Sequence, residues 1–282
     1  MTPGEGGGPG AEGSFELDRD TSLERGAKGH YRGAVSDGWR VGGGPNGGYL
    51  AAICLRAVLG ESPFPDPVTM TVHFLERPAI AACEVEVTAL RLGRGHASFR
   101  AELSQDGVVR CAALATLGRW REPGPLDFQP EPPEVPAPSA SLAVRRVGEG
   151  ATLWDRLDTR AARRDDLFMF RTEPGEAVTG GWIRLRDGRP TDALAVALFL
   201  DSWPPAVFGR TLEADPLGAP TIEYTVHWRR RPSSDWCYGR FETRTLSGGY
   251  ADEQGELYDD AGHLVAESRQ LARYLGGRSP AR

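Results

Sequence analysis

The sequence predicts an α+β protein built from two tandem units, each a helix followed by an antiparallel sheet. Three observations lead to this prediction. PVTMTVHFLERP at residues 67–78 aligns without a gap with TIEYTVHWRRRP at residues 221–232. In each half an apolar helical segment precedes alternating strands separated by turn residues. A proline-rich segment, residues 121–144, lies between the halves.

The two halves are related by one offset of 154 residues, which aligns His73 with His227 and Cys83 with Cys237. One shared tetrapeptide could arise by chance, but a register held over about 40 positions indicates an internal duplication. Since the two histidines match across the repeat, we interpret them as structural strand residues rather than as catalytic bases.

The chain is expected to divide into four segments. Residues 1–24 hold glycines, prolines and acids that cannot supply a buried face, which favours a disordered tail. An N-terminal unit is expected over residues 25–120 and a C-terminal unit, with the active site, over residues 145–276. Residues 121–144 contain a proline at roughly every third or fourth position. Because proline removes backbone donors and restricts the preceding residue, this segment is expected to be a connector.

Within each unit the helix is expected first. The segments GGYLAAICLRAVLG and TDALAVALFLD are apolar nearly all round, as expected if each sheet wraps its own helix. The strands of the first unit are VTMTVHF, CEVEVTALRLG, ASFRAELSQDG and RCAALATLGRW. Those of the second are TIEYTVHW, DWCYGRFETRTL, ADEQGELYDDAG and LVAESRQLARYL, with DLFMFRTEP and GGWIRLRD as candidates ahead of the helix.

The first helix begins in a glycine-rich stretch in which Gly42, Gly44 and Gly47 satisfy G-x-G-x-x-G. A dinucleotide fold needs a buried strand before these glycines and parallel βαβ units after them. AVSDGWRV precedes them and a meander follows, so that function is rejected. The glycines are expected to form a tight turn and to permit close packing. The N–H groups of Gly47 and Gly48 are candidate donors to a substrate carbonyl oxygen or anion.

Composition limits the partners. A formal charge of −6 gives no electrostatic reason to expect nucleic acid or an anionic membrane. The longest apolar run, ALAVALFL, is far shorter than the roughly 20 residues of a membrane span, and the start has no secretory pattern. The four cysteines form no C-x-x-C pair. A cytoplasmic protein with reduced thiols, without metal or other cofactor, is therefore expected.

Five segments carry a family resemblance: GGPNGGYLAA, TVHFLERP, LDSWPP, PTIEYTVHWRRRP and HLVAESRQ. Over residues 25–120 and 145–275 the sequence resembles the type II acyl-CoA thioesterases, which have a double hotdog fold. The resemblance implies a hydrolase of lipid metabolism that cleaves an acyl-CoA or acyl-carrier thioester. It implies neither a nucleic acid nor a membrane partner, and a homo-oligomer stays open.

In that family an Asp, a Thr and a Gln of the second hotdog hold a hydrolytic water. The matching residues are Asp201 after the second helix, Thr221 at the start of the next strand and Gln270 on the last strand. A thioester carbonyl is already electrophilic, so a placed water, a base and an oxyanion donor suffice. Burial at the end of an apolar helix would raise the pKa and basicity of Asp201.

Comparison of the halves supports these three residues. The first helix has no acid from residue 46 to residue 60, Pro67 aligns with Thr221, and Ala115 aligns with Gln270 when one residue is allowed for Gly262. Taken singly, the three could instead be a turn acid and two ordinary strand residues. Glu223, on the strand that Thr221 opens, is expected to share a face with Thr221 and His227 and is a candidate to shape the site.

Two other functions stay open. A hotdog hydratase or dehydratase needs a histidine acting with a polar partner near the helix, and no D-x-N-x-x-H stretch is present. A non-hydrolytic protein that binds acyl thioesters on the same scaffold is the second alternative, because a fold does not fix a function.

Overall fold

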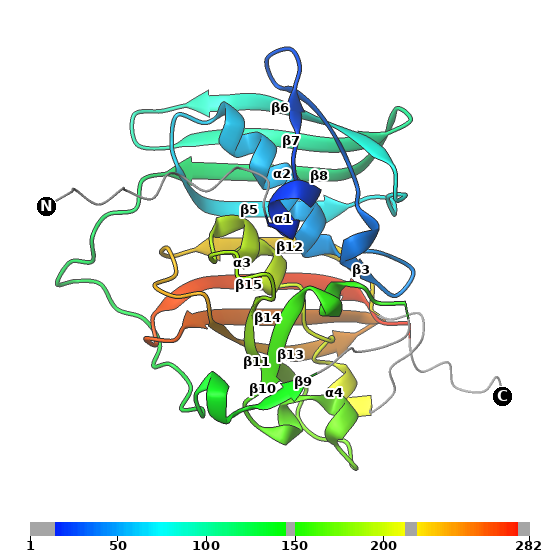
Figure 1. The fold of residues 1–282 in the computed structure, drawn as a ribbon, viewed down its shortest axis with the longest axis vertical. Coiled ribbons are helices and arrows are strands. Elements are labelled where there is room, and N and C mark those ends of the chain that lie inside the picture. The colour runs from blue at the N-terminus through cyan, green and yellow to red at the C-terminus, as the bar shows by residue number, and fades with distance from the viewer. Residues whose placement is uncertain (1–14, 145–149, 212–218, 276–282) are drawn as a thin grey trace, which may run out of the picture.

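The computed structural model describes residues 15–144, 150–211 and 219–275. Thirteen of its strands form one antiparallel sheet, in the order β1-β2-β6-β7-β8-β5-β12-β15-β14-β13-β11-β10-β9. The N-terminal half is the upper part of Figure 1 and the C-terminal half the lower part. The predicted α+β class is confirmed.

The elements have the following bounds. The first half of the sheet contains β1 (Glu24–Arg25), β2 (His30–Ala34), β5 (Asp66–Phe74), β6 (Ala82–Leu92), β7 (Ala97–Gln105) and β8 (Val108–Gly118). The second half contains β9 (Leu142–Val144), β10 (Leu157–Ala161), β11 (Val178–Leu185), β12 (Thr221–Trp228), β13 (Cys237–Ser247), β14 (Tyr250–Asp259) and β15 (Leu264–Arg273). The helices are α1 (Glu16–Asp20), α2 (Gly47–Glu61), α3 (Ala193–Phe199) and α4 (Phe208–Thr211), and β3 (Arg40–Val41) pairs with β4 (Gly44–Pro45).

The sheet has an internal two-fold relation at its centre. Strands β5 and β12 pair antiparallel with Thr71 opposite Thr225, and their Oγ1 atoms lie 2.8 Å apart. These threonines hold the same place in the repeat. Outward from this pair the strand order is β5-β8-β7-β6-β2 on one side and β12-β15-β14-β13-β11 on the other. The two tandem units of a double hotdog are therefore confirmed.

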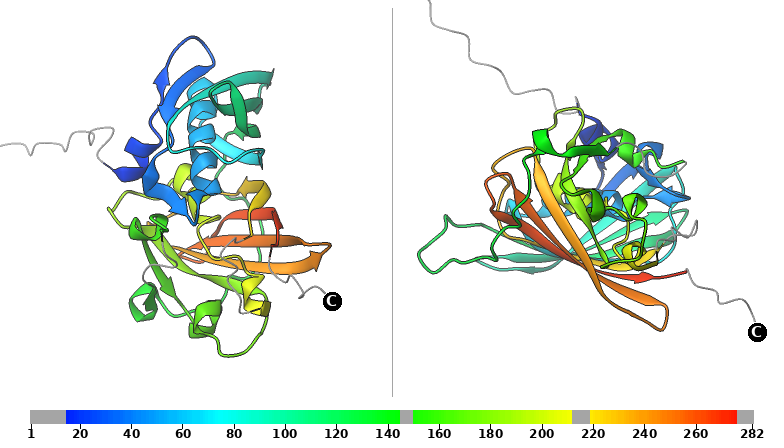
Figure 2. Two further views of the ribbon diagram at one scale, coloured as in Figure 1. Left: turned by 90° about the vertical axis from the view of Figure 1, so that its right-hand side faces the viewer. Right: turned by 90° about the horizontal axis from the view of Figure 1, so that it is seen from below.

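Helices α2 and α3 pack on one side of the curved sheet (Figure 2). Asn46 caps α2 by accepting the Tyr49 N–H at 2.9 Å, and Asp192 caps α3 by accepting two N–H groups at 3.0 Å. Most side chains of both helices are buried, which explains why neither helix has a polar face. None of the described helices combines the length and apolar character that crossing a membrane would require.

Residues 15–24 are ordered, although a disordered tail is expected from the sequence over residues 1–24. Residues 16–20 form α1, the Leu17 side chain is fully buried, and Trp39 Nε1 donates to the Asp20 carboxylate at 2.8 Å. One apolar residue in a polar segment gives no periodic signal, although burying it supplies enough stabilisation to hold a single turn. Residues 1–14 lie outside the described residues.

The segment ahead of the second helix also differs from expectation. GGWIRLRD lies largely in β11, whereas DLFMFRTEP forms the end of one 3₁₀ turn and a second at Phe168–Phe170. On the side of β11 away from β13, the pairing strand is β10. Residues 121–137 of the connector contain neither helix nor strand, and Gln129 anchors them by hydrogen bonds to Gly262 and Leu264. The end of the connector differs from expectation, because it forms a 3₁₀ turn at Pro138–Ala140 and strand β9 of the sheet. The domain boundaries stay predictions, and residues 145–149 and 276 lie outside the described residues.

Candidate active site

Asp201 lies directly after α3, at the point where this helix meets the start of α2. Its Oδ2 atom accepts the Gly48 N–H at 2.7 Å and the Asn46 Nδ2–H at 2.9 Å. The same Asn46 amide donates to the Asp201 carbonyl oxygen at 2.6 Å. The carboxylate of the second half is thus held by the helix start of the first half, where the helix dipole favours a negative charge.

Burial nevertheless dominates the electrostatics of Asp201. Burial raises the pKa of its carboxyl to about 6, although hydrogen bonds from Gly48, Gln270, Gly47 and Asn46 act to lower it. The side chain is only partly buried. A carboxyl in this setting is ionised at neutral pH and is more basic than an ordinary aspartate, as a general base requires.

The other two residues predicted from the sequence lie beside it. Thr221 Oγ1 donates to Gln270 Oε1 at 2.9 Å, and Gln270 Nε2 donates to the carbonyl oxygen of Leu200 at 3.3 Å. Gln270 is 6% exposed and lies close enough to Asp201 to lower the pKa of its carboxyl. The structure therefore brings Asp201, Thr221 and Gln270 into one cluster at the junction of the halves.

A β-bulge decides which face of β12 the Thr221 side chain occupies. Thr221 pairs with Ala272 while Glu223 pairs with Leu271, so Ile222 is the extra residue. An extra residue reverses the alternation of faces, which places Thr221 on the core face with Gln270 and leaves Glu223 on the outer face. The expectation that Glu223 and Thr221 share a face is therefore wrong.

The two matched histidines lie away from this cluster. His73 on β5 and His227 on β12 are both exposed. Alternation along β12 places His227 on the face opposite to the buried Tyr224 and Val226. Neither histidine side chain therefore belongs to the Asp201 cluster on the core face.

The amides at the start of α2 have a different partner from the one expected. The Gly48 N–H, predicted to bind a substrate carbonyl oxygen, donates to Asp201 Oδ2 at 2.7 Å. The Gly47 N–H also acts on this carboxylate, since it helps to lower the pKa of Asp201. In this structure the two groups orient the carboxylate, and their expected role as donors to a substrate stays a prediction.

The corresponding place in the other half has no polar trio. Register pairs Met70 with Ala115 where Tyr224 pairs with Gln270, and Pro67 stands at the position of Thr221. Counted from the two helix caps, Leu55 corresponds to Asp201. The duplication therefore retains one such cluster among the described residues.

An ion-pair network lies beside the position in the first half that corresponds to the Asp201 cluster. Asp18 of α1 accepts two hydrogen bonds from the Arg189 guanidinium, both at 2.9 Å, and one from Arg56 at 2.8 Å. Arg189 also donates to the N-cap carboxylate of Asp192. Helix α1 thus ties the end of α2 to the start of α3, opposite to the Asp201 junction.

Two further residues of the cluster were missed in the sequence. Asn46 is visible only as a helix cap, because its contact with Asp201 spans the two halves. Glu253 on β14 lies directly opposite Gln270, and its Oε2 accepts the Ala206 N–H at 2.6 Å. It stands in the charged stretch ADEQGE, where no pattern distinguishes an inward carboxylate from an outward one.

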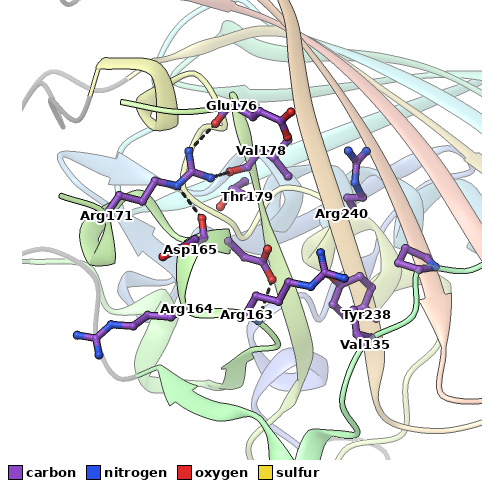
Figure 3. A pocket seen from close by; sticks show the side chains of 12 residues that line it. Val135, Arg163, Arg164, Asp165, Arg171, Glu176, Val178, Thr179, Tyr238 and Arg240 are labelled. Carbon is purple, nitrogen blue, oxygen red and sulfur yellow. Dashed lines mark hydrogen bonds between the residues drawn. The ribbon is translucent and has the colours of Figure 1, made fainter. Parts of the chain in front are cut away.

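The described residues also line two hollows away from this cluster. One of about 380 Å³ contains several arginines (Figure 3), but Arg171 donates to the carbonyl oxygens of Asp165, Glu176 and Val178 and is part of the scaffold. The other, of about 440 Å³, lies over charged side chains of β12 to β15 and includes His227. Neither is lined by Asp201, and the described residues contain no group of three or more His, Cys, Asp or Glu that could hold a metal ion.

Two family models match the chain. The acyl-CoA thioesterase N-terminal domain matches residues 35–118, and the acyl-CoA thioesterase C-terminal domain matches residues 124–274. Among curated proteins, an uncharacterized protein of Mycobacterium tuberculosis is 27% identical over 274 residues, covering 86% of this chain and 90% of its own length.

Solved structures with a similar fold include proteins named as thioesterases. A provisionally assigned thioesterase II from Thermobifida fusca is similar with a TM-score of 0.84 and 28% identity, covering 93% of this chain and 99% of that one. A hotdog-fold protein of unknown function from Alicyclobacillus acidocaldarius gives 0.85 and 25%, covering 95% and 100%. An acyl-CoA thioesterase II from Mycobacterium marinum shares the fold at 0.72 and 21%, covering 93% and 99%.

Proposed function

The chain belongs to the acyl-CoA thioesterase family, and from this premise we propose that it hydrolyses an acyl-CoA thioester to the free acid and coenzyme A. One observation carries the proposal. A partly buried carboxyl with a pKa of about 6 lies beside a hydroxyl and a primary amide that hydrogen-bond to each other. This combination supplies a base and two neutral groups that can hold a water molecule.

In the proposed reaction Asp201 takes a proton from the attacking water. Gly48 and Asn46 both bind Oδ2 of this carboxylate, and we assign the proton to Oδ1. Thr221 and Gln270 would fix the remaining contacts of the water without competing for its proton. The water oxygen then adds to the thioester carbonyl, and the C–S bond breaks.

The first test is the release of free thiol from a panel of acyl-CoAs. Asp201→Asn keeps the shape and hydrogen bonds of the side chain but removes the basic oxygen. Positioned general-base catalysis contributes about 10²–10⁴ in rate, so kcat should fall by a factor in that range. Binding of acyl-CoA should persist, which can be measured by competition with an unreactive analogue.

Variants of the neighbours separate this role from a general loss of structure. Thr221→Ala and Gln270→Ala should each have smaller effects than Asp201→Asn, and combined losses should fall short of the product of the separate factors. His73→Gln, on the exposed side of β5, should stay within a few-fold of the unaltered protein. Full activity in Asp201→Asn would rule out the proposed base. Binding without turnover in the unaltered protein would instead favour an acyl-thioester-binding function.

A further inference from the structure

Glu253 is a second carboxyl on the face of the sheet that carries the proposed active site. In the register of β14 and β15 it lies directly opposite Gln270, and side chains of opposed residues project to the same face. Its strand neighbour Ala251 is 2% exposed and faces the core. The adjacent Asp252 projects to the other face, where it pairs with Arg269.

The contacts of Glu253 connect it to the segment that follows Asp201. Its Oε2 accepts the Ala206 N–H at 2.6 Å, five residues beyond Asp201. On the strand at its other side it faces Thr243, whose buried hydroxyl has no hydrogen-bond partner within the described structure. Its neighbours on β13, β15 and the 202–206 segment named here are neutral, and within the part of the chain that the structure describes the charged group that acts on its pKa is Asp201.

In this setting the carboxyls of Glu253 and Asp201 have different pKa values. Burial and, to a smaller extent, the charge of Asp201 raise the pKa of Glu253 to about 7, against the lowering effect of the Ala206 N–H. Asp201 itself has a pKa of about 6. Between these values Asp201 is ionised while Glu253 holds a proton, which is the condition for a base and an acid in one site.

We propose that Glu253 is the general acid of the site and protonates the departing thiol sulfur. The proposal rests on the thioester hydrolysis proposed above. Water adds its oxygen to the carbonyl carbon and gives one proton to Asp201. The C–S bond then breaks, its electron pair goes to sulfur, and sulfur takes the proton of Glu253. Asp201 loses its proton to solvent and Glu253 regains one, so that thioester and water become acid and thiol.

The test compares two leaving groups on one acyl chain. The acyl-CoA releases an alkyl thiol, whose thiolate is a moderately strong base with a pKa near 8.5, like that of cysteine. An aryl thioester with a strongly acidic thiol releases a thiolate that needs no proton. In the unaltered protein, kcat/KM for acyl-CoA should decline above about pH 7 as Glu253 ionises, whereas the aryl thioester should show no such decline.

Glu253→Gln gives the second arm, because its amide oxygen can still accept the Ala206 N–H. We expect kcat for acyl-CoA to fall by about 10²-fold, the lower end for acid catalysis, and its alkaline decline to disappear. With the aryl thioester the loss should shrink to about threefold or less. Asp252→Asn, the same change one position along on the opposite face, should leave both substrates within about twofold.

The possible outcomes distinguish failure of the acid role of Glu253 from failure of the proposed hydrolysis. Equal losses in Glu253→Gln with both leaving groups, or an alkaline decline that is the same for both esters in the unaltered protein, would overturn the acid role and leave hydrolysis standing. If Glu253→Gln does not fold, the comparison of the two esters on the unaltered protein still decides. Absence of any thioester hydrolysis by the unaltered protein would overturn the proposed function itself.

Discussion

At Asp201 two opposing effects act on one carboxyl. Donors from the start of α2 favour its charge, yet burial outweighs them and raises its pKa from 3.8 to about 6. The folded state therefore binds a proton more tightly than the unfolded chain. Between about pH 4 and pH 6 the folded state holds this proton while the unfolded state does not, so the free energy of unfolding decreases as pH rises through this window.

Asp201→Asn should therefore be more stable than the unaltered protein above pH 6. A shift of about two pKa units corresponds to about 3 kcal/mol, and partial exposure reduces the expected gain to about 1–2 kcal/mol. Urea unfolding at pH 4 and pH 7.5 measures the effect, and the difference between the two proteins should shrink at pH 4. A variant less stable than the parent at pH 7.5 would contradict this account.

The sequence was informative about residues whose signal lies in the repeat. Asp201 and Gln270 differ from their counterparts in the other half, and the structure brings both into the cluster with Thr221. Their catalytic roles stay predictions. The partner of the Gly48 N–H could not be found, because it comes from the other half, and the outward face of Glu223 depends on a bulge that alternation alone does not reveal.

At the scale of elements, α1 is a short helix that connects the two long-range partners Arg56 and Arg189. Burial acts to raise the pKa of the Asp18 carboxyl, but hydrogen bonds and charges from these arginines outweigh it and hold the pKa below 3.8. The stabilisation is therefore present above about pH 4 and is lost as pH falls through the lowered value. A five-residue helix gains its stability from these contacts and from Leu17.

Asp18→Asn should lower the free energy of unfolding by about 1–3 kcal/mol at pH 7, because it leaves two arginines without their shared carboxylate. Arg189 keeps its pairing with Asp192, which limits the loss. Thiol release should change little, since the network lies opposite to Asp201. Glu84→Gln, which removes an exposed pair with Arg32, is the control and should stay within about 0.5 kcal/mol.

Elements with strong periodicity were predicted well and short ones were not. The helix at residues 47–60 and the paired meanders follow from apolar runs and turn residues, and both appear in the structure. The 3₁₀ turns around Phe168 and the helix at residues 16–20 are held by tertiary contacts, such as the hydrogen bond from Arg171 to the Gly209 carbonyl oxygen and the burial of Leu17. Such contacts leave no local pattern in the sequence.

At the scale of the whole molecule, the halves are joined twice. Strands β5 and β12 continue one sheet across the boundary, and α2 packs against α3 above it. The second contact requires Gly48, because a β-carbon there would lie 2.6 Å from the carbonyl oxygen of Ala197 and 3.0 Å from the Cα atom of Leu198. Both obstacles are backbone atoms, which cannot move without displacing α3 and with it Asp201.

Gly48→Ala should therefore weaken the fold and the proposed site together. Alanine favours a helix over glycine by about 1 kcal/mol, but forcing a methyl group into packed backbone costs about 1–3 kcal/mol or more, so we expect a net loss of stability. Gly95→Ala, where a β-carbon would meet nothing within 4 Å, is the matched control. Urea unfolding measures the difference in stability between the two variants, and thiol release measures the difference in activity.

Because the Gly48 N–H orients Asp201, activity of the folded fraction should also fall, by at least about tenfold. A Gly48→Ala protein as stable and as active as Gly95→Ala would show that the α2–α3 contact does not set the position of the carboxylate.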